Sequence, residues 1–336
     1  MVNAVPTSQP LNLLIVILNY RTPQLTIDCL SSLVDEMAAL PTARVIVTDN
    51  DSGDGSVEKI EAAIKTQNWG HWVSMMPLPK NGGFAYGNNA AIRPYIENKT
   101  LPPYVLLLNP DTIVRPKAMQ ALLAFMETHP EAGLAGSRLE DPDGTPQCSA
   151  FRFHTLWSEI DTGTRLGIIS KFLDRWIIAP PVSEQQCQTD WVAGASLIIR
   201  REVIEAIGLM DEEYFMYYEE MDYCLQAQRA GWPCWYVPES RVVHLVGQSS
   251  GVTDTKRPPK RRPQYWFDSR RRYFLKNYGW LYSSVADLLW AIGFSSWRMR
   301  RVLQQKPDLD PPQLLGDFWR NSTFIQGCSI PPAKST

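Results

Sequence analysis

Carboxylates stand directly after two apolar runs of the chain, where they could bind a cation or a polar ligand. Asp111 follows Tyr104–Leu108 in the order Asn-Pro-Asp-Thr, and Asp49 follows Val45–Thr48. A carboxylate in such a position can ligate a hard divalent cation such as Mg²⁺ or Mn²⁺, and a bound diphosphate would supply further oxygen ligands. Taken alone, the Asp111 motif is better explained as a turn, because Asn-Pro-Asp is ordinary turn chemistry.

Two further motifs could bind a nucleotide. Asp49 could accept hydrogen bonds from a base imide or from ribose hydroxyls, whereas helix capping explains Asp54 better than it explains Asp49. The run Lys80–Asn89, KNGGFAYGNN, has two adjacent glycines that permit close backbone approach, and Lys80 could meet phosphate. A tight strand-to-helix turn explains the same run, which is not the GxGxxG dinucleotide fingerprint.

Three acids open a predicted helix, namely Glu219, Glu220 and Asp222. Acids there complement the helix dipole, which is the simpler explanation. One of them could instead act as a general base toward an acceptor hydroxyl, because adjacent like charges raise a carboxyl pKa toward neutrality. His244 lies in the strand-like run VVHL, where a lone histidine is usually structural. With a carboxylate metal site predicted elsewhere, its imidazole could be a further ligand.

Alternating strands and helices over residues 13–140 would position these groups. The predicted strands are 13–18, 45–48, 72–76, 104–108 and one beginning at 132–136. The predicted helices between them cover 24–37, the stretch from the turn at 52–56 to about residue 66, the stretch after 81–83 through residue 96, and a stretch that begins near residue 116. This alternation indicates a mostly parallel sheet covered on both faces, which binds ligands at the carboxyl ends of its strands. Polar runs follow four of those ends: Asn19-Tyr20-Arg21, Asp49-Asn50-Asp51, Lys80-Asn81 and Asn109-Pro110-Asp111.

The second half of the chain is less regular. Residues 141–189 read as acceptor-side loops with a variable helix. The later predicted elements are a strand over 191–199 with a break at Gly194-Ala195, a helix over 219–230, strands over 234–237 and 241–245, and helices over 264–277 and 280–303.

The composition limits which classes of protein this chain could belong to. The chain has 336 residues, of which 44% are hydrophobic and 20% charged, and a net charge of −2, so nothing draws the whole chain to nucleic acid. Its six cysteines form no CxxC pair and indicate reduced thiols in the cytosol. The apolar run 13–18 is too short for a signal peptide or a membrane span, so we expect a cytoplasmic protein.

The series of motifs, taken in order, resembles a known family. The motifs are LNYRTP, TDNDSGDGS, NGGFAYGNNAA, LLLNPDT, DWVAGASLIIRREV, MDEEYFMYYEEMDYCLQAQRAGW and VVHLVGQS. The chain resembles the family 2 inverting glycosyltransferases with the GT-A fold, and among them the bacterial rhamnosyltransferase-like branch that builds polysaccharides and cell-wall linkers. The resemblance covers residues 12 to 280, roughly.

That resemblance implies an α/β GT-A fold, a mostly parallel central sheet flanked by helices with a C-terminal helical extension. The implied domains are a flexible N-terminus over 1–11 and a GT-A domain over 12–255, followed by a helical extension and tail over 256–336. Within the GT-A domain, residues 12–140 form the Rossmann-like nucleotide-sugar-binding half and residues 141–255 the acceptor and catalytic half.

The resemblance also implies roles for individual residues. Asn109 and Asp111 stand at the family's DxD metal motif, and because the first position is Asn, Asp111 should carry most of the ligation of Mg²⁺ or Mn²⁺. His244 matches a late histidine that can complete the metal site. The residues expected to bind the nucleotide sugar are Asn19, Tyr20, Arg21, Asp49, Asp51, Lys80, Asn81, Gly82, Gly83, Asn89 and Asn109.

On the acceptor side, Trp191, Gly194 and Ala195 match the segment that shapes the cleft. Glu219-Glu220 stand where the family usually has Glu-Asp, so the expected base is Glu220, which is one methylene longer than the family's Asp. A catalytic geometry must hold to about 0.5 Å, so Asp222 or Glu219 could take the role instead.

The predicted function is metal-dependent transfer of a sugar, with inversion, from a nucleotide-sugar donor to a hydroxyl of a glycan or lipid-linked glycan. The favoured donor is dTDP-L-rhamnose. The main rival is a catalytically impaired protein that keeps the fold and binds the sugar nucleotide, which Glu220 and Asn109 favour. A nucleotidyltransferase would want a glycine-rich basic signature where this chain has Asn19–Pro23, and a dehydrogenase would want the dinucleotide fingerprint there.

The C-terminal region could contact a membrane. Apolar residues recur at helical spacing over Leu281–Ile292 near several tryptophans, with Arg298, Arg300 and Arg301 after them. Nine basic residues and one acid also lie between Lys256 and Lys276, which could form a local basic face. Such a helix could lie on the inner face of the cytoplasmic membrane. Packing on the catalytic domain, or a homodimer interface, explains the apolar stripe equally well.

Overall fold

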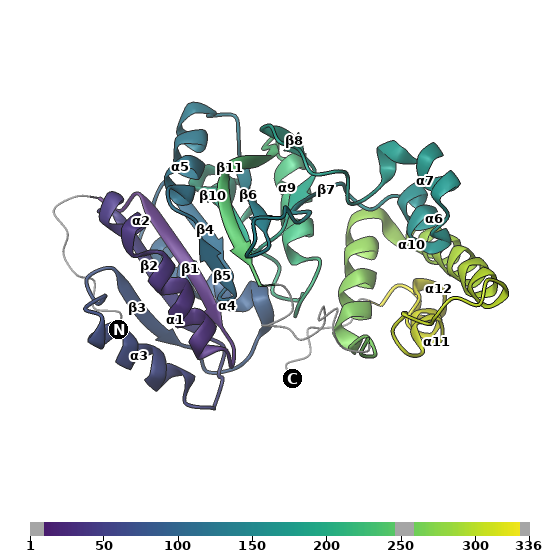
Figure 1. Ribbon diagram of the computed structural model, residues 1–336, viewed down its shortest axis with the longest axis horizontal. Coiled ribbons are helices and arrows are strands. Elements are labelled where there is room, and N and C mark those ends of the chain that lie inside the picture. The colour runs from purple at the N-terminus through teal and green to yellow at the C-terminus, as the bar shows by residue number, and fades with distance from the viewer. Residues whose placement is uncertain (1–9, 246–258, 330–336) are drawn as a thin grey trace.

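A nine-stranded sheet forms the centre of the computed structural model, which describes residues 10–245 and 259–329 (Figure 1). Its strands are β1 Leu13–Asn19, β2 Ala43–Asp49, β3 Val73–Pro77, β4 Tyr104–Leu108, β5 Thr112–Val114, β6 Leu134–Glu140, β8 Cys187–Thr189, β10 Ser196–Arg200 and β11 Cys234–His244. They lie in the order β3-β2-β1-β4-β10-β6-β11-β5, and β8 pairs with β11. A separate two-stranded sheet joins β7 Ala150–Phe151 to β9 Trp191–Val192.

The strands of the first half are parallel, as the alternation of strands and helices predicts. β1 pairs in parallel with β2 and β4, and β2 with β3, so their carboxyl ends meet at one edge. Beyond β4 the sheet is mixed, because β10 runs antiparallel to both β4 and β6, while β11 is parallel to β6 and antiparallel to β5. The sheet as a whole is therefore more mixed than the sequence predicts.

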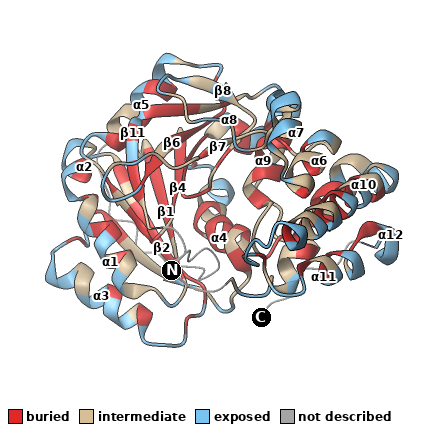
Figure 2. Ribbon diagram, turned by 45° about the vertical axis from the view of Figure 1, so that its right-hand side comes forward, coloured by how far each residue is buried: buried red, intermediate tan, exposed pale blue. Residues whose placement is uncertain are grey.

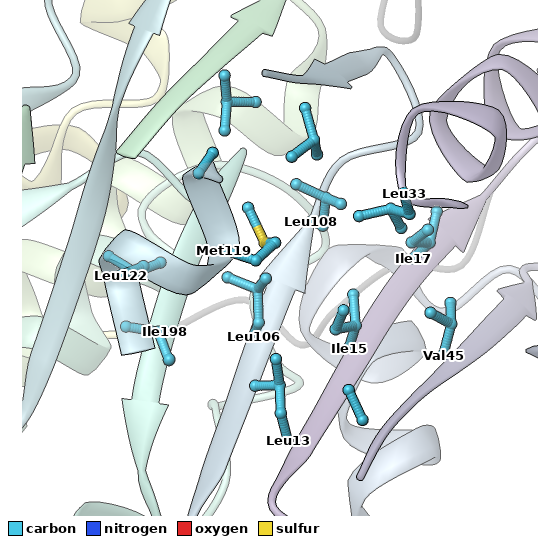
Figure 3. Packing of buried hydrophobic residues seen from close by; sticks show 14 of the residues in the cluster. Leu13, Ile15, Ile17, Leu33, Val45, Leu106, Leu108, Met119, Leu122 and Ile198 are labelled. Atoms are coloured by element: carbon cyan, nitrogen blue, oxygen red, sulfur yellow. The ribbon is translucent and has the colours of Figure 1, made fainter. Parts of the chain in front are cut away.

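β1 is an uninterrupted apolar run because the sheet is covered on both faces. Leu13, Ile15 and Ile17 enter one hydrophobic core, and the alternate residues Leu14 and Val16 enter the other. Figure 3 shows the first core, where Ile17 of β1 lies beside Leu33, and Leu106 of β4 lies between Ile15 and Met119.

Helices build the two faces. The helices of the sheet domain are α1 Pro23–Ser32, α2 Val34–Ala39, α3 Ser56–Thr66, α4 Gly83–Glu97, α5 Ala118–Thr128, α8 Arg201–Ile207 and α9 Glu219–Arg229. α1, α2, α3 and α5 supply the first core, and α4, α8 and α9 supply the second. The predicted helix over 24–37 is thus two helices that meet at Leu33, and the predicted strand over 191–199 is two short strands in different sheets.

The remaining helices gather beside the sheet domain (Figures 1 and 2). They are α6 Leu156–Thr164, α7 Gly167–Phe172, α10 Gln264–Leu303, α11 Leu314–Arg320 and α12 Thr323–Gln326. α10 bends at Gly279, whose φ of +77° lies in the left-handed region that favours glycine, so the two predicted terminal helices are confirmed as the two arms of α10. α6 comes from residues 141–189, so the irregular stretch and the C-terminal extension form one helical unit.

Part of the basic run, which extends into α10, is taken up by ion pairs. Arg270 is buried between Glu159 of α6 and Asp287 of the second arm of α10. Arg272 and Lys276 pair with Asp211 instead of facing solvent freely. Lys256 and Arg257 lie outside the described residues.

The apolar stripe of α10 is split. Trp290 packs against Phe318 of α11 with ring centroids 4.0 Å apart, whereas Leu281, Leu288 and Ile292 stay exposed. The prediction that the apolar stripe packs on the catalytic domain is therefore wrong for these three residues. In the described part of the chain, no helix is both long and apolar enough to cross a membrane. All six cysteines are free, as predicted.

Removing Arg270 is expected to destabilise the protein strongly. Burial opposes ionisation of Glu159, but Arg270 and His154 hold its pKa below the ordinary value, so Arg270 faces two buried carboxylates. Arg270→Leu leaves both without their cation, which costs about 3–5 kcal/mol in comparable cases. Denaturant unfolding followed by circular dichroism measures the loss.

The matched control is Arg298→Leu, because Arg298 pairs with Asp308 at the surface, where an ion pair contributes about 0–1 kcal/mol. Equal losses in the two variants would show that the buried pairs around Arg270 do not stabilise the fold.

Candidate active site

The ends of β1 and β2 hold a rigid carboxylate. Asn19 lies opposite Asp49 in the register, and its Nδ2 donates to Asp49 Oδ2 at 2.6 Å. The backbone N–H and hydroxyl of Ser52 donate to the same carboxylate at 2.9 and 2.6 Å. Arg21 holds Ser52 in place, because its backbone N–H donates to Ser52 Oγ and its Nε donates to the Ser52 carbonyl oxygen. Asp49 is thereby fixed in one orientation.

Ser52 is a member of this group that the sequence analysis missed. The motif TDNDSGDGS contains it, but only the observed turn shows that its hydroxyl meets Asp49. Of the neighbouring predicted residues, Tyr20 lies under the Arg21 guanidinium at 5.1 Å, and Asp51 is exposed in a left-handed conformation.

The glycine loop packs against protein rather than leaving an open approach. Gly83 has a φ of +88°, and a Cβ there would lie 1.9 Å from the carbonyl oxygen of Phe215. Phe84 N donates to that same oxygen at 2.9 Å, and Asn81 Oδ1 accepts from Gly83 N. Gly83 is therefore required for contact with the chain just before the acidic helix. Asn50 Nδ2 donates to the Gly83 carbonyl oxygen, which ties this loop to the end of β2.

The other predicted residues of this loop differ in their surroundings. Lys80 is exposed, 5.1 Å from the Tyr86 ring centre, and a Cβ on Gly82 would meet the same Tyr86 side chain. Asn89 is not with the group: it is buried and donates to the Met210 carbonyl oxygen and Glu212 Oε1. Asn89 lies on the inner face of α4, so its side-chain amide bonds to the chain around Met210 and not to the residues near Asp49.

Asp111 and His244 meet through strand pairing. β5 begins directly after Asp111 and runs antiparallel to β11, with Thr112 opposite His244. Asp111 Oδ1 lies 3.5 Å from His244 Nε2, and Leu245 N donates to the Asp111 carbonyl oxygen at 2.9 Å. A carboxylate with an imidazole suits Mn²⁺ or Mg²⁺. Residues 10–245 and 259–329 contain no cluster of three or more metal-binding side chains. A bound diphosphate or water could supply further ligands.

The acidic helix begins under backbone strain. Tyr217 and Tyr218, just before it, have φ values of +69° and +70°, a conformation that non-glycine residues adopt rarely and that clusters at functional sites. Burial raises the pKa of Glu219 well above its ordinary value, and the neighbouring Glu220 charge raises it further. Burial also raises the pKa of Glu220, while the N–H of Gly194 limits the rise by hydrogen bonding to it.

Gly194 and Ala195 connect this carboxylate to the loop that holds Asp111. A Cβ on Gly194 would lie 3.8 Å from Glu220 Cβ and 3.1 Å from Phe84 Cζ. Ala195 O accepts from Asn109 N at 3.0 Å. Contacts therefore run from Asn50 through Gly83 and Phe84 to Gly194 and Glu220, and from Ala195 to the loop that holds Asp111. Trp191 lies farther back, stacked on Phe151 with ring centroids 4.3 Å apart.

Asp222 does not join this group. It is buried and accepts hydrogen bonds from Lys276 Nζ at 2.7 Å and Asn277 Nδ2 at 2.6 Å, both on α10. These contacts join α9 to α10, so the structure favours a structural role for Asp222 and leaves Glu219 and Glu220 as the candidates for a base.

Comparisons with known proteins point the same way. The family model described as "Glycosyl transferase family 2" matches residues 14–177. The chain is 29% identical over 223 residues, 62% of this chain and 68% of the relative, to N-acetylglucosaminyl-diphospho-decaprenol L-rhamnosyltransferase of Mycobacterium tuberculosis. It is 23% identical over 289 residues to the dTDP-rhamnosyl transferase RfbF of Shigella flexneri, which covers 84% of this chain and 86% of the relative.

A solved structure of similar fold is a mannosyltransferase from Pyrobaculum calidifontis, in complex with GDP-Man and Mn²⁺. Its TM-score is 0.55 at 12% identity, over 96% of this chain and 85% of that one. At this identity the likeness concerns the fold alone.

Proposed function

The chain belongs to glycosyl transferase family 2 and has the GT-A fold, and from that premise we propose that it transfers L-rhamnose from dTDP-L-rhamnose to a glycan on a lipid diphosphate. The names of the two relatives support rhamnose as the sugar, and one of them names a decaprenol-linked diphosphate acceptor. A prenyl-linked acceptor would have the enzyme work at the inner face of the cytoplasmic membrane.

The observation that carries the proposal is the series of contacts that joins Glu220 to the loop of Asp111. In this proposal Glu220 removes the proton of the acceptor hydroxyl as that oxygen attacks the anomeric carbon opposite the leaving group, which inverts the configuration. Asp111 and His244, whose Oδ1 and Nε2 atoms lie 3.5 Å apart, would hold a divalent cation. Such an ion stabilises the charge that develops on the departing nucleotide diphosphate.

The rigid carboxylate of Asp49 suits recognition of the nucleoside. Asn19 and Ser52 orient it, so that its remaining acceptor capacity is directed at one place. Arg21 and Lys80 are the cations of this group and would contact the diphosphate. Held in this way, the donor would lie between the ends of β1 and β2 and the loop of Asp111.

A thermal-shift panel tests the donor. We expect dTDP and dTDP-L-rhamnose with Mn²⁺ or Mg²⁺ to raise Tm more than UDP, GDP or their sugars, because a ligand at 100 times its Kd stabilises by about 2.7 kcal/mol. Asp143→Asn is the control, since Asp143 is exposed and accepts only from its own turn. A larger shift with GDP or UDP sugars would contradict the dTDP donor.

A transfer assay with the preferred donor separates the enzyme from the rival binding protein. A protein that only binds the sugar nucleotide would show the shift but release no dTDP when a prenyl-linked N-acetylglucosaminyl diphosphate is added. Release of dTDP with a new disaccharide product would exclude that rival.

A further inference from the structure

A second candidate site lies beside the two-stranded sheet. A cavity of about 450 Å³ is bounded by β7 with its flanking residues, by β8, and by the loop over 180–183. Cys148, Ser149 and Ala150 form one wall, and Tyr236 of β11 closes the inner side. None of the residues assigned above to the donor or the cation lines it.

Two arginines give the cavity positive charge. Arg152 and Arg175 both line it, and Asp190 is the single acid among its described lining residues. Asp190 Oδ2 is held by the N–H of Phe153. Arg152 Nη1 donates to the Asp174 carbonyl oxygen at 2.7 Å, and the Arg175 guanidinium lies 4.0 Å over the Trp176 ring. Neither arginine forms an ion pair with a carboxylate of the described chain, so both charges stay available for an anion.

The inner wall holds a hydroxyl with no partner. Tyr236 is 1% exposed, and its oxygen has no hydrogen-bond partner among the described residues. An unsatisfied buried polar group costs about 1–3 kcal/mol. Because burial raises its pKa to about 12, the phenol stays protonated at neutral pH and can donate. A ligand oxygen in the cavity would satisfy it.

Hydrogen bonds connect the cavity wall to the proposed active site. Gln147, next to the wall, donates from Nε2 to the His244 carbonyl oxygen at 3.0 Å. Ser149 O accepts from Ala193 N at 3.0 Å, and Ala193 directly precedes Gly194, which contacts Glu220. Hydrogen bonds therefore link the wall of the cavity to the segments that carry His244 and Gly194.

We propose that this cavity binds the phosphate groups of the acceptor through Arg152, Arg175 and the Tyr236 hydroxyl. The inference rests on the proposed function, because it assumes an acceptor that carries phosphate. Binding there would hold the acceptor sugar near Glu220 while leaving the donor diphosphate to the cation. The site is selective for anionic acceptors and makes no contact with the nucleotide sugar.

Thermal shift in EDTA tests anion binding without the cation site. The probes are inorganic pyrophosphate, N-acetylglucosamine 1-phosphate and citronellyl diphosphate, with sodium sulfate at equal ionic strength as the reference for non-specific salt effects. We expect pyrophosphate and citronellyl diphosphate to raise Tm above the sulfate reference, and Arg152→Gln/Arg175→Gln to abolish that gain. A larger Tm gain with citronellyl diphosphate than with pyrophosphate would identify a lipid-linked source of the phosphate. Equal gains with the two probes would identify a free phosphate.

Tyr236→Phe is the second variant, because it deletes the hydroxyl and keeps the ring. Without ligand its Tm should equal or exceed that of the wild type, since an unsatisfied polar group is removed, while its gain with pyrophosphate falls. Arg201→Gln is the matched control, as Arg201 lines a different cavity near Leu101. A gain that survives both the double variant and Tyr236→Phe would overturn the proposal.

Kinetics separate this inference from the function on which it rests. With a prenyl-linked N-acetylglucosaminyl diphosphate, the double variant should raise the acceptor KM by about tenfold or more, with kcat and the donor KM unchanged, as expected for lost ground-state binding. Normal donor shifts together with an unchanged acceptor KM would reject the phosphate site and leave the transferase standing. Absence of any donor shift would reject the proposed donor instead.

Discussion

Replacing Glu220 by glutamine is expected to lower kcat by about 10²–10⁴-fold, the usual contribution of a general base. Glutamine keeps the shape of the side chain and its place beside Gly194 but cannot take up the acceptor proton. Binding of the nucleotide sugar should change little, because in this proposal Asp49, Arg21 and Lys80 hold the donor. Single-turnover transfer and donor titration measure the two effects separately.

Two neighbouring variants serve as controls for Glu220. Glu220→Asp restores the residue that the family usually has, so we expect it to keep much of the activity. Asp222→Asn should weaken the contact with Lys276 and lower stability more than turnover, since Asp222 joins α9 to α10. Near-normal turnover in Glu220→Gln, with a collapse in Glu219→Gln, would move the role to Glu219.

The pH profile gives an independent check on the same residue. Because burial raises the pKa of Glu220, the acid limb of kcat/KM should lie above the ordinary glutamate pKa of about 4.3, and activity should be lost as pH falls through it. The raised pKa affects stability in the opposite direction to activity. A carboxyl whose pKa is raised by folding favours the native state at low pH and loses that contribution as pH rises. Glu220→Gln should therefore be more stable than the wild type above neutrality.

The first half of the fold could be predicted because its signals are local. The apolar run of β1 and the turn residues after it need only the alternation of strand and helix to be placed. His244 could be proposed as a further ligand from its residue type and was supported by the family resemblance, but nothing in the sequence pairs β5 with β11, which brings it beside Asp111. The three residues of β5 form too short a strand to be recognised from periodicity.

Several predicted site residues have partners in distant parts of the chain, which the sequence does not reveal. Asp222 reads as a candidate base until α10 is placed beside α9, because only then does Lys276 reach it. Asn89 belongs to a nucleotide-binding motif by pattern, yet Glu212 accepts its amide. Gly83 indicates a close approach, and in the structure the Phe215 backbone is what approaches it. In each case the residue type suggested a polar contact or a close approach, but the sequence could not say which group would make it.

Replacing Asp111 by asparagine is expected to lower kcat/KM by about 100-fold or more, because the several kcal/mol that a metal ion supplies to a departing diphosphate depend on its ligation. Asn109 already lacks a charge at the first position of the motif, so Asp111→Asn would leave no carboxylate in this loop. His244→Ala should cost less, since it removes a neutral ligand and keeps the charge.

The cation itself gives the readout that separates ligation from folding. Mn²⁺ titrated in the presence of dTDP, followed by electron paramagnetic resonance, should bind the wild type and Asp143→Asn alike and Asp111→Asn much more weakly. Asp111→Asn removes the carboxylate that lies beside the His244 imidazole, whereas Asp143→Asn removes an exposed carboxylate in a turn, so comparing the two variants isolates the effect of position. Equal Mn²⁺ affinity in all three proteins, or full transfer in EDTA, would show that the 3.5 Å contact between Asp111 and His244 is an ordinary structural pair and not a metal site.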